Sequence, residues 1–222
     1  FGELIGLNAE HSVLATYYKN NILHLFMLPS LLASSVLHQR SISSEQLLSD
    51  IEQLYPLLKA ELFLYVSSLR TYCQALLQFM TEQGLIESDG VNYYAPAQQS
   101  RHYFMLSLLA HNAEDTLQRY AIVLNLIVAQ GPIHRADLEN RAHQLAQRLL
   151  NLHGIIAPEY YDKGLFATLV NALKEAGISH TNSNNQVCSS LRLQQLTQTV
   201  NTLLRNDILQ TLQSIMPQHT AP

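Results

Sequence analysis

Residues 20–39, NNILHLFMLPSLLASSVLHQ, form a run of twenty residues without Asp, Glu, Lys or Arg. As an α-helix the run would be about 30 Å long, which matches the hydrocarbon core of a bilayer. It also holds two Asn, two His, three Ser and a central proline, and so many polar groups disfavour a membrane span. The run instead favours an interfacial helix or a helix buried under another part of the protein, with the wall of a ligand site as a further interpretation.

An unusually small share of the chain is charged. Of 222 residues, 14% are charged and 47% are hydrophobic, against about 25% charged in an average soluble domain. We therefore expect lipid or protein to cover part of the surface. Seventeen acidic and thirteen basic residues give a net charge of −4, and the basic residues form no dense run, so no nucleic-acid partner is expected.

The cysteines and the first residues give hints about context. Cys73 and Cys188 have no metal-ligand spacing and are predicted to be buried thiols, which fits a reducing cytoplasm. The opening residues, FGELIGLNAEH, lack a basic region followed by an apolar core, so they are not a signal peptide. Because the chain starts at Phe1 without Met, we expect a longer protein whose N-terminal part lies outside this chain.

Helical periodicity dominates the chain. Asn8 is a good N-cap for a first helix through residue 27, and Pro29 can open a second helix that ends near Gln39. Ser43 and Gln46 have the spacing of a capping box at the start of the next helix. Later helices are expected over 41–55, 59–83 with a break near Ser67, 100–130, 134–154, 159–177 and 191–215.

Two β-hairpins interrupt these helices. Asp89 and Gly90, between two short apolar or aromatic runs, predict a hairpin within 85–96, and residues 178–190 predict a looser one. Each hairpin follows a helix that ends in a glycine C-cap, Gly84 or Gly177. The fold class predicted is mainly α, a multi-helix domain with one or two short β-hairpins, arranged as duplicated winged-helix-like units.

This organisation gives four segments. Residues 1–40 are a helix pair expected to dock on an N-terminal catalytic domain outside the chain. Residues 41–96 and 97–190 are the two winged-helix-like units, and 191–222 are a C-terminal helix with a polar tail. Such a fold implies no DNA binding by itself, since function lies in the surface.

Common catalytic motifs are absent from the sequence, among them His-Glu-x-x-His, Gly-x-Ser-x-Gly and Gly-rich phosphate loops. His111 and Asp115 are one helical turn apart, but no third ligand is evident, so a solvated surface pair is favoured over a metal site. Glu114 and Asp115 point about 100° apart on a helix and are predicted to be surface charges. Asp137 and Glu139 fall in the first turn of a helix, where its dipole explains them as well as catalysis does.

One polar stripe stands out in the opening segment. On a helix Tyr17, Asn21 and His24 lie in line with Leu28, beside an apolar face formed by Leu14, Tyr18, Ile22, Leu25 and Phe26. Hydrogen bonds between helices within a packed core are the more favoured interpretation. The alternative is a polar site for a substrate or for a neighbouring domain, and Tyr17, Asn21 and His24 are its candidate residues.

Several segments resemble a known family. They are FGELIGLNAEHSVLATYYKNNILHLFMLPSLLAS, LYPLLKAELFL, DTLQRYAIVLNL and AQRLLNLHGIIAPEYYDKGLFATLV. The chain resembles the C-terminal region of the bacterial membrane-bound glycerol-3-phosphate 1-O-acyltransferases, through about Gly177, with less similarity in the last forty or so residues.

This resemblance implies a parent enzyme that moves an acyl group from acyl-CoA or acyl-carrier protein to the sn-1 hydroxyl of glycerol 3-phosphate, in phospholipid synthesis at the inner membrane. The family uses a His followed by four residues and an Asp, in which the His is the general base. No His here has an Asp five positions later, since His24, His111 and His134 are followed at that offset by Pro, Thr and Glu. No catalytic residue is therefore assigned to this chain, and neither a cofactor nor a metal site is expected.

The expected role is to pack against the catalytic domain, to cover an acyl or acyl-carrier-protein site, or to hold the enzyme at the cytoplasmic membrane surface. We expect the chain to be inactive alone. The alternatives are a non-enzymatic helical or winged-helix protein-interaction module and a free-standing helical enzyme with an unrecognised site.

Overall fold

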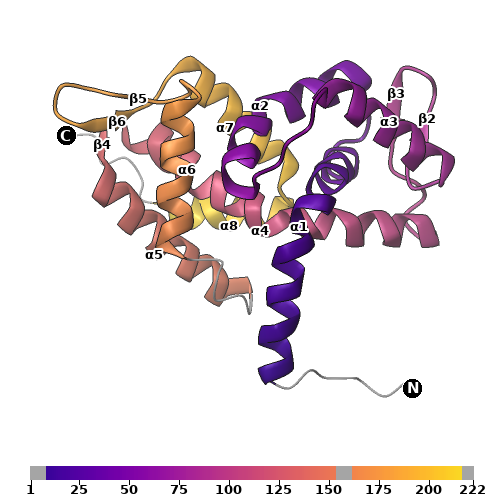
Figure 1. Cartoon of the computed structure of the whole chain (residues 1–222), viewed down its shortest axis with the longest axis horizontal. Coiled ribbons are helices and arrows are strands. Elements are labelled where there is room, and N and C mark those ends of the chain that lie inside the picture. The colour runs from indigo at the N-terminus through magenta and orange to yellow at the C-terminus, as the bar shows by residue number, and fades with distance from the viewer. Residues whose placement is uncertain (1–8, 154–161, 217–222) are drawn as a thin grey trace.

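A computed structural model of the chain describes residues 9–153 and 162–216, with only the backbone helix described for 9–21. These residues form a mainly α-helical fold with two small antiparallel sheets (Figure 1). The predicted fold class is therefore confirmed.

One order of elements occurs twice in the fold: helix, strand, helix, helix, strand, strand. The first set is α1 (Ala9–His38), β1 (Ile42–Ser43), α2 (Ser44–Leu62), α3 (Leu69–Glu82), β2 (Glu87–Ser88) and β3 (Asn92–Tyr94). The second is α4 (Arg101–Gln130), β4 (Ile133–His134), α5 (Arg135–His153), α6 (Lys163–Glu175), β5 (His180–Thr181) and β6 (Gln186–Cys188). Helices α7 (Leu191–Leu203) and α8 (Asn206–Ile215) follow.

The two sheets have the same topology, because the strand before the second helix joins each predicted hairpin. The strand orders are β1-β3-β2 and β4-β6-β5, and every pairing is antiparallel. Ile42 pairs with Tyr93, and Ile133 pairs with Val187. Both hairpins are thus confirmed, and each gains a third strand that the sequence did not predict. The division into segments ending at 40, 96 and 190 stays a prediction.

Capping residues set the helix boundaries, and the glycine C-caps occur at equivalent places in both repeats. The Ser43 hydroxyl accepts a hydrogen bond from the backbone N–H of Gln46 at 3.2 Å, which confirms that predicted cap. At the ends of α3 and α6, Gly84 and Gly177 adopt positive φ of 68° and 64°. The next residue then donates back into the last turn, from the N–H of Leu85 to Met80 and from that of Ile178 to Leu173, both at 2.9 Å.

Three predicted helix boundaries are wrong. Pro29 lies inside a single helix, α1, rather than between two helices, and Pro56 lies inside α2. A buried apolar surface runs past each proline, on Met27, Leu28, Leu31 and Leu32 and on Leu54, Leu57 and Leu58, and this burial outweighs the lost backbone hydrogen bond. The expected last helix is instead divided between α7 and α8.

The break between α7 and α8 places three side chains in the core. Leu204 has extended backbone, and Arg205 is the N-cap of α8. Leu204, Ile208 and Leu212 are all buried, and α8 packs on α5. Because the chain turns here, these three side chains can pack into the core. If α7 continued straight, it would point away from α5 and the side chains would not reach that surface.

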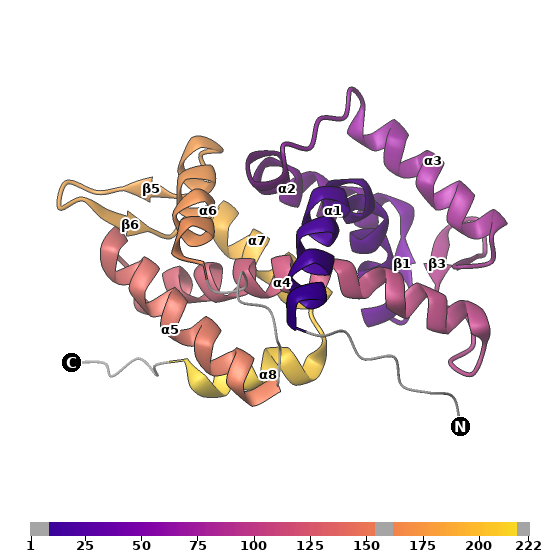
Figure 2. The ribbon, with the colours of Figure 1, turned by 60° about the horizontal axis from the view of Figure 1, so that its bottom comes forward.

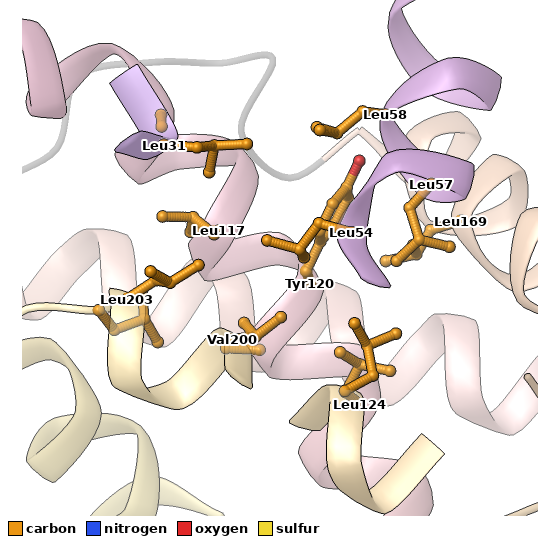
Figure 3. Close-up of a cluster of buried hydrophobic side chains, with 14 of the residues drawn as sticks. Leu31, Leu54, Leu57, Leu58, Leu117, Tyr120, Leu124, Leu169, Val200 and Leu203 are labelled. Atoms are coloured by element: carbon orange, nitrogen blue, oxygen red, sulfur yellow. The ribbon is translucent and has the colours of Figure 1, made fainter. Parts of the chain in front are cut away.

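The core joins the two repeats through their first helices. Helix α4 packs along α1, α7 and α5, and α2 of the first repeat packs on α6 of the second. Tyr120 is fully buried at the centre, among leucines and valines of α1, α2, α4, α6 and α7 (Figure 3). Asn125 and Asn201 exchange amide hydrogen bonds of 2.9 and 3.2 Å between α4 and α7. The repeats therefore share one core.

The first half of α1 stands away from this core. Figures 1 and 2 show that it leaves the body of the molecule, whereas its second half lies against α4. Met27, Leu28 and residues 31–36 are buried, but Ile22, Leu25 and Phe26 are exposed. The core-helix interpretation of the opening segment is thus confirmed after residue 26 and wrong for these three residues.

Candidate docking surface

The exposed part of α1 borders an apolar recess. This recess encloses about 440 Å³ and lies between α1 and the connection from α2 to α3. His24, Leu25 and Leu28 line it from α1, and Phe63, Tyr65 and Tyr72 are among the residues that line it from the other side. We call these six residues the docking surface.

Of the three predicted site residues, the structure places only His24 on this surface. His24 is exposed and lines the recess. Tyr17 and Asn21 lie on α1, but their side chains are outside the described part of the structure. The expectation that these three residues act together therefore stays a prediction.

Two aromatic side chains dominate the surface. Phe63 and Tyr65 are 78% and 76% exposed, which is unusual for large apolar groups unless a partner covers them. Phe63 also has a left-handed backbone conformation, with φ of 51°, at the end of α2. A non-glycine residue pays about 1 kcal/mol or more for this conformation, and such strain often marks functional positions.

The connection that carries these aromatic residues is held by hydrogen bonds. The Tyr55 hydroxyl donates to the carbonyl of Leu64 at 3.0 Å and accepts from the N–H of Val66 at 2.9 Å. The ammonium group of Lys59 lies 5.0 Å from the centre of the Tyr65 ring, within range of a cation–π interaction. The aromatic side chains are therefore displayed from an ordered loop, which lowers the entropy cost of binding.

Ion pairs fix the two helices that flank the loop. Arg70 of α3 donates to Glu45 at 2.8 and 2.9 Å and to Glu52 at 3.0 Å, both on α2. In α4, Arg119 forms a buried ion pair with Glu61, and their side chains are only 8% and 7% exposed. Burial alone would lower the pKa of Arg119, but Glu61 more than offsets this, so the pKa lies above its usual value. The end of α2 is thereby tied to the core.

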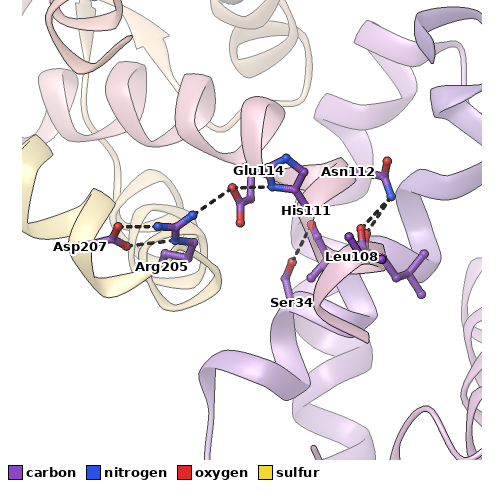
Figure 4. A network of polar contacts seen from close by, with 9 residues as sticks. Ser34, Leu108, His111, Asn112, Glu114, Arg205 and Asp207 are labelled. Atoms are coloured by element: carbon purple, nitrogen blue, oxygen red, sulfur yellow. Dashed lines mark hydrogen bonds and ion pairs between the residues drawn. The ribbon is translucent and has the colours of Figure 1, made fainter. Parts of the chain in front are cut away.

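A second polar network joins α4 to the start of α8 (Figure 4). His111 lies 3.0 Å from Glu114, which also faces Arg205 at 3.7 Å, and Arg205 pairs with Asp207 at 2.6 Å. Arg205 lowers the pKa of Asp207 by hydrogen bonding. Glu114 was predicted to be a surface charge, but its side chain is only 17% exposed and faces both His111 and Arg205.

The remaining candidates have structural roles. Asp137 lies in the first turn of α5, and Glu139 pairs with Arg135 at 2.6 Å. Cys73 and Cys188 are free and buried, as predicted. Among residues 22–153 and 162–216, whose side chains the structure describes, no group of three or more His, Cys, Asp or Glu side chains could hold a metal ion. Over residues 9–153 and 162–216, no helix is both long enough and apolar enough to cross a bilayer.

Sequence reasoning missed Phe63 and Tyr65 because residues 59–83 were expected to be one helix with a break near Ser67. The break was predicted in the right region, and the loop spans residues 63–68. The run FLYV within it was the available signal, since four consecutive apolar residues cannot all face the core from one irregular loop.

The fold and this surface define a mainly helical, internally repeated module with an apolar face open to solvent. The profile of the glycerol-3-phosphate acyltransferase C-terminal region matches residues 1–182. The chain therefore belongs to this family of C-terminal regions, as the sequence resemblance implied.

Curated relatives agree with the family match. A glycerol-3-phosphate acyltransferase of Shewanella baltica strain OS155 is 41% identical over 220 residues, which are 99% of this chain and 26% of that protein. The corresponding proteins of Shewanella putrefaciens and Shewanella loihica are 40% and 39% identical, covering 98% and 99% of this chain and 26% of each relative. This chain thus spans about a quarter of the length of the relatives it matches.

Proposed function

We propose that this chain is the C-terminal helical part of a glycerol-3-phosphate 1-O-acyltransferase, and that it docks on the catalytic part of that enzyme through the docking surface. The enzyme would transfer an acyl group from acyl-CoA or acyl-carrier protein to the sn-1 hydroxyl of glycerol 3-phosphate. The chemistry would lie N-terminal to this chain, because no His here is followed by an Asp at the family's spacing.

One observation carries the docking proposal: the side chains on the outer part of α1 and on the α2–α3 loop are apolar, exposed and adjacent. Leu25 is 61% exposed beside the recess that Phe63 and Tyr65 also line. An ordered aromatic pair at the rim of an apolar recess has the chemistry of an interface hot spot, where single side chains contribute about 2 kcal/mol or more. The same helix carries Tyr17 and Asn21, the other members of the predicted polar stripe.

The relatives support an intramolecular partner. The chain covers only 26% of their length and matches their C-terminal region, so most of each relative's sequence precedes the part that corresponds to α1. A partner that arrives from the N-terminal side would meet the outer half of α1 first. The N-terminal catalytic part is therefore the occupant that we propose for the docking surface.

Two finer expectations belong to the same proposal. The enzyme would work at the cytoplasmic face of the inner membrane, in peripheral or interfacial contact, and acyl-carrier protein would be a partner. Two features support both expectations: the low share of charged residues and the exposed aromatic side chains, which suit contact with a lipid surface or a protein.

Covalent footprinting tests the docking surface. The 222-residue chain and the longer enzyme are labelled at exposed side chains, and modification is measured by mass spectrometry. We expect Phe63 and Tyr65 to be labelled in the isolated chain and protected in the longer enzyme. Leu191, an exposed leucine at the start of α7, is the matched control and should be labelled in both. Equal labelling of Phe63 and Tyr65 in the two proteins would refute the docking proposal.

Two activity measurements complete the test. His24→Ala in the longer enzyme should impair activity or assembly more than His219→Ala, whose position lies outside the described residues. Equal activity and stability of the two variants would count against a role for the polar stripe. Acyl transfer to glycerol 3-phosphate by the purified 222-residue chain would show that chemistry lies within it, against our proposal.

A further inference from the structure

Helix α6, the start of α5 and the β5–β6 hairpin lie together at the end of the molecule opposite α3 (Figure 1). A smaller recess lies between these three elements. It encloses about 200 Å³. Its polar lining consists of Arg135, Asn171, Lys174, Ser179, Thr181 and Asn185, and no carboxylate lines it. A recess rich in donors and free of carboxylates is unexpected in a chain with a net charge of −4.

Arg135 is oriented by its neighbours but keeps unused donors. Its Nε donates to Glu139 at 2.6 Å, and one terminal nitrogen donates to Oδ1 of Asn171 at 2.8 Å. The other terminal nitrogen makes a long contact of 3.5 Å with the carbonyl of Ala167. A guanidinium has five N–H groups, so two remain for a ligand. Because Asn171 accepts through its oxygen, its side-chain NH₂ is also available.

Lys174 and Ser179 supply further donors. The Lys174 ammonium carries three N–H donors and the Ser179 hydroxyl one O–H donor, and both residues line the recess. Ser179 is only 6% exposed, yet it lines the recess. A ligand oxygen in the recess could accept a hydrogen bond from each of these two side chains.

The hairpin forms a rigid wall of the recess. The side-chain oxygen of Asn182 accepts hydrogen bonds from the N–H groups of Asn184 and Gln186 at 3.0 and 2.9 Å. The backbone N–H of Asn185 donates to the carbonyl of Asn182 at 3.0 Å, and Asn185 has a positive φ of 57°. The turn thereby holds the Asn185 amide at the recess without a flexible loop.

We propose that this recess binds the phosphate group of a ligand. Arg135 and Lys174 carry two positive charges, and Glu139 offsets one, so the site has a net charge that favours an anion. The hydroxyl and amide donors surround that charge from both walls, which suits a tetrahedral anion with several acceptor oxygens. The phosphate could be carried by a small soluble molecule or by a lipid headgroup, and the experiment separates these sources.

The test uses the 222-residue chain and a Lys174→Ala variant. Because Lys174 is exposed, the variant should keep the fold, which circular dichroism checks. In the first arm, inorganic phosphate is titrated at constant ionic strength while amide NMR signals of Ser179 and Thr181 are followed. In the second arm, the proteins are sedimented with phosphatidylcholine vesicles that contain or lack phosphatidic acid. Arg148→Ala, on the exposed side of α5, is the matched control.

We expect saturable shifts with inorganic phosphate in the parent chain and in Arg148→Ala, and an affinity about tenfold weaker in Lys174→Ala. Sedimentation with phosphatidic acid that depends on Lys174, without shifts in the first arm, would support the site and assign the headgroup as the source. Responses that do not saturate, or that are the same in Lys174→Ala as in the parent chain, would overturn the proposal.

Discussion

Removal of one partner from the buried ion pair of Arg119 and Glu61 should destabilise the chain strongly. In Glu61→Gln the Arg119 guanidinium keeps its charge and its hydrogen bond of 3.1 Å to Thr116, but it loses the carboxylate. Both side chains are less than a tenth exposed, so water cannot replace the lost partner. The expected cost is about 3–5 kcal/mol, a large part of the roughly 5–15 kcal/mol that stabilises a typical domain.

Urea denaturation of the 222-residue chain, followed by far-ultraviolet circular dichroism, measures this cost. The midpoint should fall while the slope of free energy against urea stays unchanged. Glu45→Gln is the control, because Glu45 pairs with Arg70 at the surface, where solvent screens the charges, and its loss should shift the midpoint much less. The double variant Glu61→Met with Arg119→Leu removes both charges and should be about as stable as the parent chain, or more stable.

Two results would refute this reasoning. If Glu61→Gln cost no more than Glu45→Gln, burial would not amplify the loss of an ion-pair partner here. If the double variant were as unstable as Glu61→Gln, the cost would come from lost packing or geometry rather than from an uncompensated charge. Either result would also weaken the argument that this pair holds the end of α2 in place.

Three other predictions concern single side chains. Tyr55→Phe should cost about 1–2 kcal/mol and speed hydrogen exchange at the Val66 amide, and unchanged exchange would contradict the bracing role of the hydroxyl. Burial, with a smaller contribution from Glu52, raises the pKa of Cys73 to about 11, so iodoacetamide should alkylate it slowly in the folded chain and quickly in urea; equal rates would contradict this. Burial raises the pKa of Asp50 in the folded chain. The protonated carboxyl therefore stabilises the fold below the ordinary pKa of Asp, and this stabilisation is lost as pH rises through the folded-state pKa. Asp50→Asn should therefore gain stability relative to the parent near neutral pH and show a smaller gain in acid, as paired denaturation curves would reveal.

Local signals in the sequence predicted the fold well where one residue decides a boundary. The Ser43 cap, the Gly84 and Gly177 ends and the Asp89-Gly90 turn each act within a few residues, so their outcome does not depend on distant packing. Pro29 misled the prediction because its local cost is smaller than the burial gained along a continuous helix. The third strand of each sheet was missed because two residues are too few to show a period.

The candidate site was less predictable for a related reason. Helical spacing identified the stripe of Tyr17, Asn21 and His24, but periodicity cannot tell whether an apolar face meets the core or solvent. The exposure of Leu25 depends on where α4 stops covering α1, which is a tertiary property. The aromatic loop at Phe63 likewise became visible only when the positions of α2 and α3 were known.

The continuity of α1 has a thermodynamic consequence. Its outer part, through Phe26, contributes His24 and Leu25 to the docking surface, and its inner part, from Met27, lies in the shared core, with no break at Pro29. A partner that binds only when the outer part of α1 is helical also favours the state in which the inner part is packed, because the two parts belong to one helix and binding shifts its folding equilibrium. Occupancy of the docking surface should therefore raise the apparent melting temperature of both repeats together, although the partner would touch only the first.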